Sequence, residues 1–148
     1  MRLHLTIFAL AAVSACAPAG REVEPWVRPA PAEVTRTPML STTATMSDQP
    51  IALPQGPVAL VVTRTDMPSG AAIPLHRHPW PRYVYVEKGW IEMVNVDAGI
   101  TRAYGPGDVI GEPVDQWHEG RAFSDPVSMI AFDQAPPGES NMVFKGAD

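Results

Sequence analysis

The sequence is short, acidic and poor in cysteine: its 148 residues include 11 Lys or Arg, 16 Asp or Glu and one Cys, with a formal net charge of −5. A chain of this length has room for one ordinary domain, and the absence of a clustered basic surface argues against nucleic-acid binding. The single cysteine, Cys16, excludes an intrachain disulfide and a cysteine-rich zinc site.

The first predicted element is a lipoprotein signal peptide over residues 1–15. Arg2 supplies a positive charge, and residues 5–13 form a largely apolar run without a charge that is too short to span a bilayer. The run ends in Val-Ser-Ala before Cys16, which resembles a bacterial lipobox. The resemblance implies cleavage before Cys16 and lipid attachment to that cysteine. An ordinary signal peptide with an incidental cysteine is the alternative.

The predicted lipid is a membrane anchor that places the protein in the bacterial cell envelope, facing the periplasm. Ala17 follows the cysteine, which resembles the outer-membrane rather than the inner-membrane type of lipoprotein. Residues 17–57 contain eight of the 17 prolines. We therefore predict that residues 16–43 form a disordered, Pro-rich tether of extended and semi-rigid chain.

The remaining residues, 44–148, are predicted to form one all-β domain. Short stretches rich in β-branched and aromatic residues alternate with turns that contain Gly or Pro, and no long helical stripe occurs. Many short strands at even spacing favour a β-sandwich or barrel. The predicted strands cover residues 58–65, 82–86, 90–96, 100–104 and 127–132.

Three histidines, His76, His78 and His118, are candidate metal ligands. The first two are two residues apart, so on an extended strand both side chains leave from the same face. His118 must come from another strand. Neutral imidazole is a good ligand for transition metals, so convergence of the three rings would form a site for a divalent ion such as Fe, Mn, Ni or Zn.

The spacing around these histidines resembles the two conserved motifs of the cupin superfamily. Five residues separate a glycine from the His-x-His pair that follows it. A second glycine is followed by a proline and then by the third histidine. The matching residues are Gly70, His76, His78, Gly107, Pro113 and His118. The resemblance, to a small single-domain cupin, covers about residues 45–135. It implies a single cupin jelly-roll, a double-stranded β-helix of six to eight strands, with the histidines as metal ligands in its mouth.

The sequence departs from the cupin pattern at three positions. Arg82 stands where the family has its glutamate ligand, Asp115 where it has a glycine, and Ala122 where it has an asparagine. The resemblance without the glutamate implies a three-histidine metal site. A barrel that has lost its metal and keeps the histidines as polar lining is the alternative. Glu112 or Asp115 could supply a replacement oxygen ligand.

Arg82 is also a candidate substrate-binding residue. Arg82, Val84 and Val86 share one face of a predicted strand, and the valines belong inside the barrel. A guanidinium cannot coordinate a cation but pairs with anions. We therefore expect the site to favour a small anionic ligand, such as a carboxylate or an enolate. Alternatively, Arg82 reaches solvent or pairs with Glu87 or Glu112.

These observations leave several functions open. Three histidines on a metal leave coordination positions for dioxygen or an organic ligand, and the resemblance implies a metal-dependent oxygenase (dioxygenase-like) or isomerase acting on a small anionic or enolic compound. The first alternative is a non-catalytic module that binds a small ligand or a metal, and the second is a structural barrel without metal. No catalytic residue is assigned. Cupins commonly pair through a barrel face, so a homodimer is a further expectation.

Overall fold

The computed structural model describes residues 33–146, and the predicted signal peptide, Cys16 and residues 16–32 of the predicted tether lie outside this range. Residues 33–43 contain no strand. Within residues 33–146, no helix is long and apolar enough to cross a membrane.

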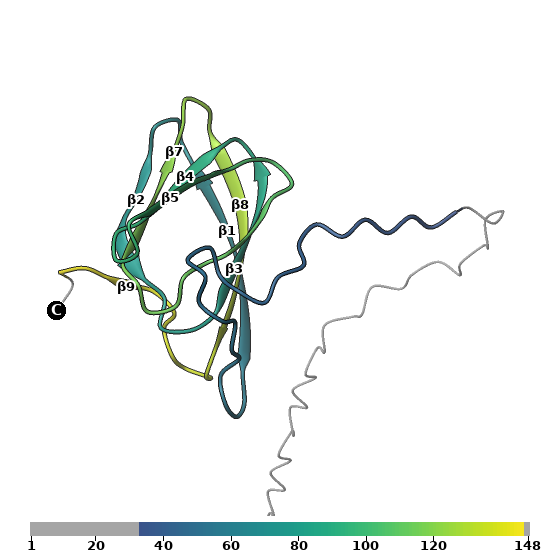
Figure 1. The fold of residues 1–148 in the computed structure, drawn as a ribbon. Helices are drawn as coiled ribbons and strands as arrows, with labels where there is room; N and C mark the ends of the chain where they lie inside the picture. The colour runs from purple at the N-terminus through teal and green to yellow at the C-terminus, as the bar shows by residue number, and fades with distance from the viewer. Residues whose placement is uncertain (1–32, 147–148) are drawn as a thin grey trace, which may run out of the picture. The chain divides into compact units, whose positions relative to one another are not determined.

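The described residues form two antiparallel β-sheets that face each other (Figure 1). The four-stranded sheet has the order β1 (Ala59–Met67), β8 (Val127–Ala135), β3 (Arg82–Lys88) and β6 (Val109–Gly111). The five-stranded sheet has the order β5 (Ile100–Tyr104), β4 (Ile91–Asn95), β7 (His118–Ala122), β2 (Ala72–Arg77) and β9 (Val143–Phe144). This architecture confirms the predicted all-β barrel.

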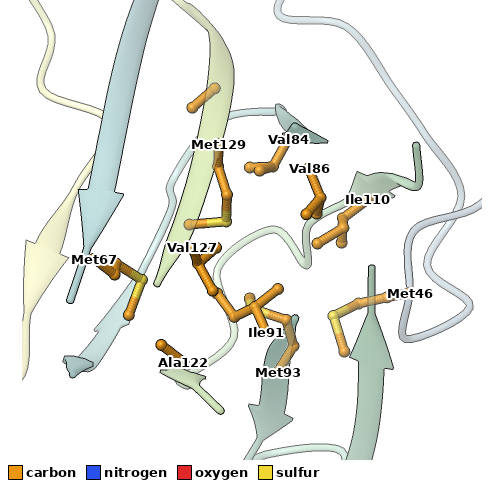
Figure 2. Close-up of a cluster of buried hydrophobic side chains, with 11 residues drawn as sticks. Met46, Met67, Val84, Val86, Ile91, Met93, Ile110, Ala122, Val127 and Met129 are labelled. Atoms are coloured by element: carbon orange, nitrogen blue, oxygen red, sulfur yellow. The ribbon is translucent and has the colours of Figure 1, made fainter. Parts of the chain in front are cut away.

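The core lies between the two sheets and is built from alternate residues of their strands. Val84 and Val86 of β3 are buried, as predicted, whereas Tyr83 and Tyr85, which alternate with them, lie half-buried on the other face. Figure 2 shows the apolar side chains of both sheets pointing toward one another. Burial of each large apolar side chain contributes about 1.5–3 kcal/mol to folding.

Gly89 lies in the turn between β3 and β4. Its φ of 75° lies in the left-handed region, where residues with a Cβ are strained. A Cβ there would also lie only 2.2 Å from the carbonyl oxygen of Pro126. Both constraints require glycine at this position.

Residues 44–50 form an N-terminal plug at one end of the barrel. Met46 reaches the core, and its backbone N–H donates to the carbonyl of Gly111 at 2.8 Å. The side-chain amide of Gln49 donates to the carbonyl of Val114 at 2.8 Å and accepts from the N–H of Val114 at 2.9 Å. The plug therefore holds the loop between β6 and β7.

Residues 136–146 form a C-terminal strap that turns back from β8. The strap turns at Gly138, which has a φ of 87°. It then adds β9 to the edge of the five-stranded sheet, where β9 pairs with His76 and Arg77 of β2 (Figure 1). The last residues of the described chain thus lie beside the strand that carries the first candidate ligand.

Candidate metal centre

Four buried side chains converge inside the barrel: His76, His78, Glu112 and His118. One potential ligand atom of each lies within 4.8 Å of those of the other three. Two donors bound about 2.1 Å from one ion lie at most about 4.2 Å apart, so the widest separation here exceeds that limit by no more than about 0.6 Å. The structure brings together the three histidines named from the sequence and adds a carboxylate.

The sheet register explains why the histidines meet. His76 lies near the end of β2, directly opposite His118, the first residue of β7. Facing residues of antiparallel strands place their side chains close together on one side of the sheet. His78 follows just beyond β2, where a parallel bridge to Val114 holds it. The ring centroids lie 4.5–5.0 Å apart.

Each imidazole is fixed by a hydrogen bond on the side away from the cluster. The Nδ1 atom of His76 lies 2.7 Å from the carbonyl oxygen of Pro74, and that of His118 lies 2.8 Å from the carbonyl oxygen of Gln116. For His78, the partner is the carbonyl oxygen of Asn141 at 2.5 Å. A carbonyl oxygen can only accept, so each Nδ1 carries a proton. In the neutral ring, Nε2 then has a lone pair available for a metal.

Glu112 makes a contact that requires positive charge. Its Oε2 atom lies 2.7 Å from Nε2 of His78 and 3.4 Å from Nε2 of His118. All three atoms are buried and have no hydrogen-bond partner of acceptable geometry. Two atoms that both present lone pairs repel at 2.7 Å unless a cation or a proton lies between them. The donor set therefore fits a divalent metal, and protonation of a histidine is the competing explanation.

In the metal-free cluster, His76 and Glu112 are held in the protonation states in which they can bind a metal. Burial, reinforced by the charge of His118, lowers the pKa of His76 to about 4, so this ring is neutral at pH 7. Burial acts to raise the pKa of the Glu112 carboxyl. The adjacent His118 and His78 side chains and the positive charge of Arg82 outweigh that effect and hold the pKa well below its usual range. Glu112 is therefore an ionised, oxygen-donating partner.

Glu112 brings its carboxylate to the histidines from a position next to Arg82. Its backbone N–H donates to the carbonyl of Arg82 at 3.0 Å, because β6 runs antiparallel to β3. The two residues are cross-strand neighbours, so a carboxylate from either position can face the same interior. Asp115, the other oxygen ligand considered from the sequence, is exposed and pairs with Arg77 outside the cluster.

Arg82 does point inward, but its closest partner is one the sequence did not identify. Its Nη1 atom donates to Oδ2 of Asp133 at 2.7 Å, and its Nε atom lies 3.6 Å from Oε2 of Glu112. Of the two pairings considered from the sequence, the structure has the one with Glu112, whereas Glu87 pairs instead with Arg64 at 2.8 Å. Arg82 and Asp133 face each other in the β3–β8 register. Arg82 and Asp133 are 51 positions apart in the sequence, and the pairing of β3 with β8 brings them together.

A cavity of about 510 Å³, here called the vestibule, is lined by none of the four cluster side chains but shares part of its lining with a smaller cavity that reaches two of them. Its lining combines apolar and hydroxyl side chains of β1 with the polar side chains of Arg82, Asp133 and Asn141. A smaller cavity of about 20 Å³ lies next to His76 and Glu112, and Thr65, Ile73, Arg82 and Met142 line both cavities. A volume of this size holds about one water molecule or ion. The vestibule therefore offers a small molecule a place beside the cluster.

Comparison with protein families places a known domain over this region. A family model described as a cupin domain matches residues 63–133. The match includes the three clustered histidines, Glu112, Arg82 and Asp133. No curated protein matches the sequence.

Solved structures share the fold but are distant in sequence. The DMSP lyase DddQ from Ruegeria pomeroyi is 24% identical with a TM-score of 0.52, over 58% of this chain and 43% of that one. The polyketide cyclase RemF from Streptomyces resistomycificus is 20% identical with a TM-score of 0.51, over 78% and 89%. Oxalate decarboxylase from Bacillus subtilis is 22% identical with a TM-score of 0.51, over 58% and 24%. The chain spans less than half the length of the DMSP lyases it matches.

Proposed function

We propose that this chain, which carries a cupin domain, binds one divalent transition metal through His76, His78, His118 and Glu112 and holds a small anionic compound beside it. The observation that carries the proposal is the set of buried Nε2 and Oε2 atoms without partners, on rings whose Nδ1 atoms are already bonded. Nitrogen and carboxylate donors suit Fe, Mn, Ni and Zn.

The chain's own charges support an anionic ligand. A divalent ion and Arg82 contribute three positive charges, and Glu112 and Asp133 contribute two negative charges. The occupied site would carry one net positive charge, which a monoanion such as a carboxylate or an enolate neutralises. Arg82 lines the vestibule, and Nε is buried without a hydrogen bond, so its guanidinium is positioned to orient the anion.

The reaction class that we propose is metal-dependent oxygenation or isomerisation of a small anionic or enolic compound. A bound metal would supply Lewis-acid polarisation of a ligand oxygen or, as Fe or Mn, redox chemistry with dioxygen. The polypeptide would bind and orient the ligand through Arg82. Thr63, Thr65, Ile73 and Met142 line the space for its body.

A non-catalytic binding module is the second candidate, and one observation favours it. The described carboxylates that line the vestibule are Asp133 and Glu139. Asp133 is occupied by Arg82 and Asn141, and Glu139 lies in the exposed turn of the strap. The vestibule thus offers no free buried acid–base group among the described residues. Oxygen uptake and conversion of the added compound, measured with candidate diketones and phenols, would separate the two functions, because an oxygenase or an isomerase converts the compound and a binding module does not.

Metal content tests the proposal directly. Protein purified without a histidine tag is expected to contain about one transition-metal ion per chain by elemental analysis. His76→Ala and His118→Ala should abolish this content, and Glu112→Gln should weaken it because the carboxylate charge is lost. Asp115→Ala is the matched control, since Asp115 lies in the same loop but outside the cluster. A wild-type protein that stays metal-free after incubation with each metal would contradict the proposal.

We further propose that the domain is lipid-anchored at Cys16 in the cell envelope, facing the periplasm, and forms a homodimer. The short apolar run before Cys16 supports the anchor. Leu60, Val62 and Phe132 are exposed apolar residues on β1 and β8 that support a dimer face. Mass spectrometry of the mature N-terminus tests the anchor, and light scattering of the anchor-free protein tests the dimer.

A further inference from the structure

The C-terminal strap reaches the cluster through one buried residue, Asn141, which is 9% exposed. It lies immediately after the turn at Gly138 and before β9. Asn141 is distant in sequence from His78 and Trp80, yet it contacts both. The strap is therefore part of the surroundings of the site and not an independent tail.

Asn141 makes hydrogen bonds to three different parts of the structure. Its backbone carbonyl accepts from Nδ1 of His78 at 2.5 Å. Its side-chain Oδ1 accepts from the backbone N–H of Trp80 at 2.8 Å, and its Nδ2 donates to Oδ1 of Asp133 at 2.7 Å. Asp133 in turn accepts from Arg82. One buried amide thus connects a candidate ligand, the loop after that ligand and the charged pair of the vestibule.

The side chain and the backbone of Asn141 act together. The side-chain hydrogen bonds attach the strap to the loop at Trp80 and Pro81 and to β8. This attachment places the Asn141 carbonyl against His78 and so fixes the ring with its proton on Nδ1. The other two histidines need no such help, because their carbonyl partners, Pro74 and Gln116, lie two residues away in the same segment.

We propose that Asn141 is a positioning residue that sets the tautomer and orientation of His78 and holds Asp133 against Arg82. The expected effect on zinc affinity rests on the proposed metal site. The expected effect on the tautomer and orientation of His78 does not, because it concerns the metal-free protein. Replacement of groups that orient a metal-binding histidine typically lowers metal affinity about 10- to 100-fold. Asn141→Asp keeps the acceptor for Trp80 but sets a second carboxylate against Asp133, so it should lower zinc affinity at least about 10-fold.

Exchanging two side chains tests whether a loss of zinc affinity comes from lost positioning of His78 or from general destabilisation of the protein. In Asn141→Asp/Asp133→Asn, the amide and the carboxylate exchange places, so the hydrogen bond between them can reform. Unlike Asp133→Asn alone, the swap keeps the negative charge next to Arg82, at position 141, and the amide oxygen at position 133 can still accept from Arg82. The swapped protein should regain zinc affinity to within about threefold of wild type. Ser140→Ala is the control, because the neighbouring hydroxyl is exposed and contacts only Met142 within the strap.

Two measurements decide the inference. Competition with a chromophoric chelator gives the zinc affinity of each variant. A two-bond ¹H–¹⁵N correlation spectrum of the metal-free protein reads the tautomer of each histidine. In Asn141→Asp, His78 should lose its Nδ1–H signature, whereas His76 and His118 keep theirs, and the swap should restore it.

The outcomes distinguish this inference from the proposed function. If wild type binds no zinc, the metal proposal fails, and the histidine spectra still decide the role of Asn141. If wild type binds zinc and Asn141→Asp matches it in affinity and spectrum, the positioning role is overturned. A swapped protein that is folded by near-ultraviolet circular dichroism but no better than the single variant also overturns it.

Discussion

At the scale of single residues, three charged side chains are coupled beside the histidines. Arg82 on β3 lies next to Glu112, whose backbone N–H donates to its carbonyl and whose carboxylate belongs to the cluster. Asp133 pairs with Arg82 at 2.7 Å. These three residues form a connected charge set beside the histidines, so a change at one of them should alter both cation and anion binding.

Arg82 and Asp133 should have opposite effects on anion binding. Arg82→Gln removes the positive charge beside the vestibule and should weaken acetate binding to the metal-loaded protein by about 10-fold, equivalent to about 1.4 kcal/mol. Asp133→Asn leaves Arg82 uncompensated, so it should strengthen acetate binding and weaken metal binding. Spectral titration of the cobalt-loaded protein measures both. Neutral acetamide is the control ligand, and equal effects on acetate and acetamide would refute the electrostatic role.

The metal-free protein should lose stability as the pH falls below neutrality. The pKa of His76 is about 4 in the folded state and about 6.5 in the unfolded chain, so the unfolded chain binds more protons between these values. Stability therefore declines from pH 6.5 to pH 4, by up to about 3 kcal/mol from this residue. Urea unfolding at several pH values measures the decline. It should be smaller in His76→Gln, and an identical pH profile would exclude His76 as its source.

At the scale of strands and loops, the sequence predicted the strands with a clear alternating or apolar run better than the others. The alternating or apolar runs of β1, β3, β4, β5 and β8 were predicted to within three residues at each end. β2, β6, β7 and β9 were not, because β2 contains Pro74, β7 contains Gly120, and β6 and β9 have only three and two residues. Their pairing with neighbouring strands overrides weak local preference.

The same limit applies to the site. The His-x-His spacing predicted two rings on one face because strand geometry is local. Glu112 was considered, but the choice between it and Asp115 depended on the path of a loop. Asp133 and Asn141 lie 51 and 63 residues from their partners, Arg82 and His78. Only the sheet register and the strap bring them together, and neither can be derived from a single sequence.

The N-terminal plug should stabilise the loop that carries the ligands. Gln49→Ala leaves the N–H and carbonyl of Val114 without their present partners, which should lower the free energy of unfolding by about 1–3 kcal/mol. Val114 lies between Glu112 and His118, so metal affinity should fall as well. Urea unfolding and chelator competition measure the two effects. Gln55→Ala is the control, because Gln55 is exposed and lies outside the plug, and it should alter neither stability nor metal affinity. A Gln49→Ala protein as stable as wild type would show that the plug does not stabilise the loop.

At the scale of the whole domain, the cluster links parts of the chain that are far apart in sequence. Its ligands come from the end of β2, the residue after β6 and the start of β7, and the strap joins β8 to β2 through Asn141 and β9. An ion bound to all four side chains would therefore connect both sheets. Since the unfolded chain does not hold these residues together, metal binding and folding must be coupled.

Removal of metal should consequently lower the thermal stability of the whole domain. A ligand present at 100 times its dissociation constant adds about 2.7 kcal/mol to the stability of the folded state. For a domain of this size, that gain corresponds to a rise in Tm of roughly 10 °C. Scanning calorimetry with zinc and with a chelator measures the difference. In His76→Ala and His118→Ala, Tm should no longer depend on zinc, whereas Asp115→Ala should respond like wild type. An equal response in all four proteins would mean that zinc binds outside the cluster, because only the two alanine variants at ligand positions lack a donor there.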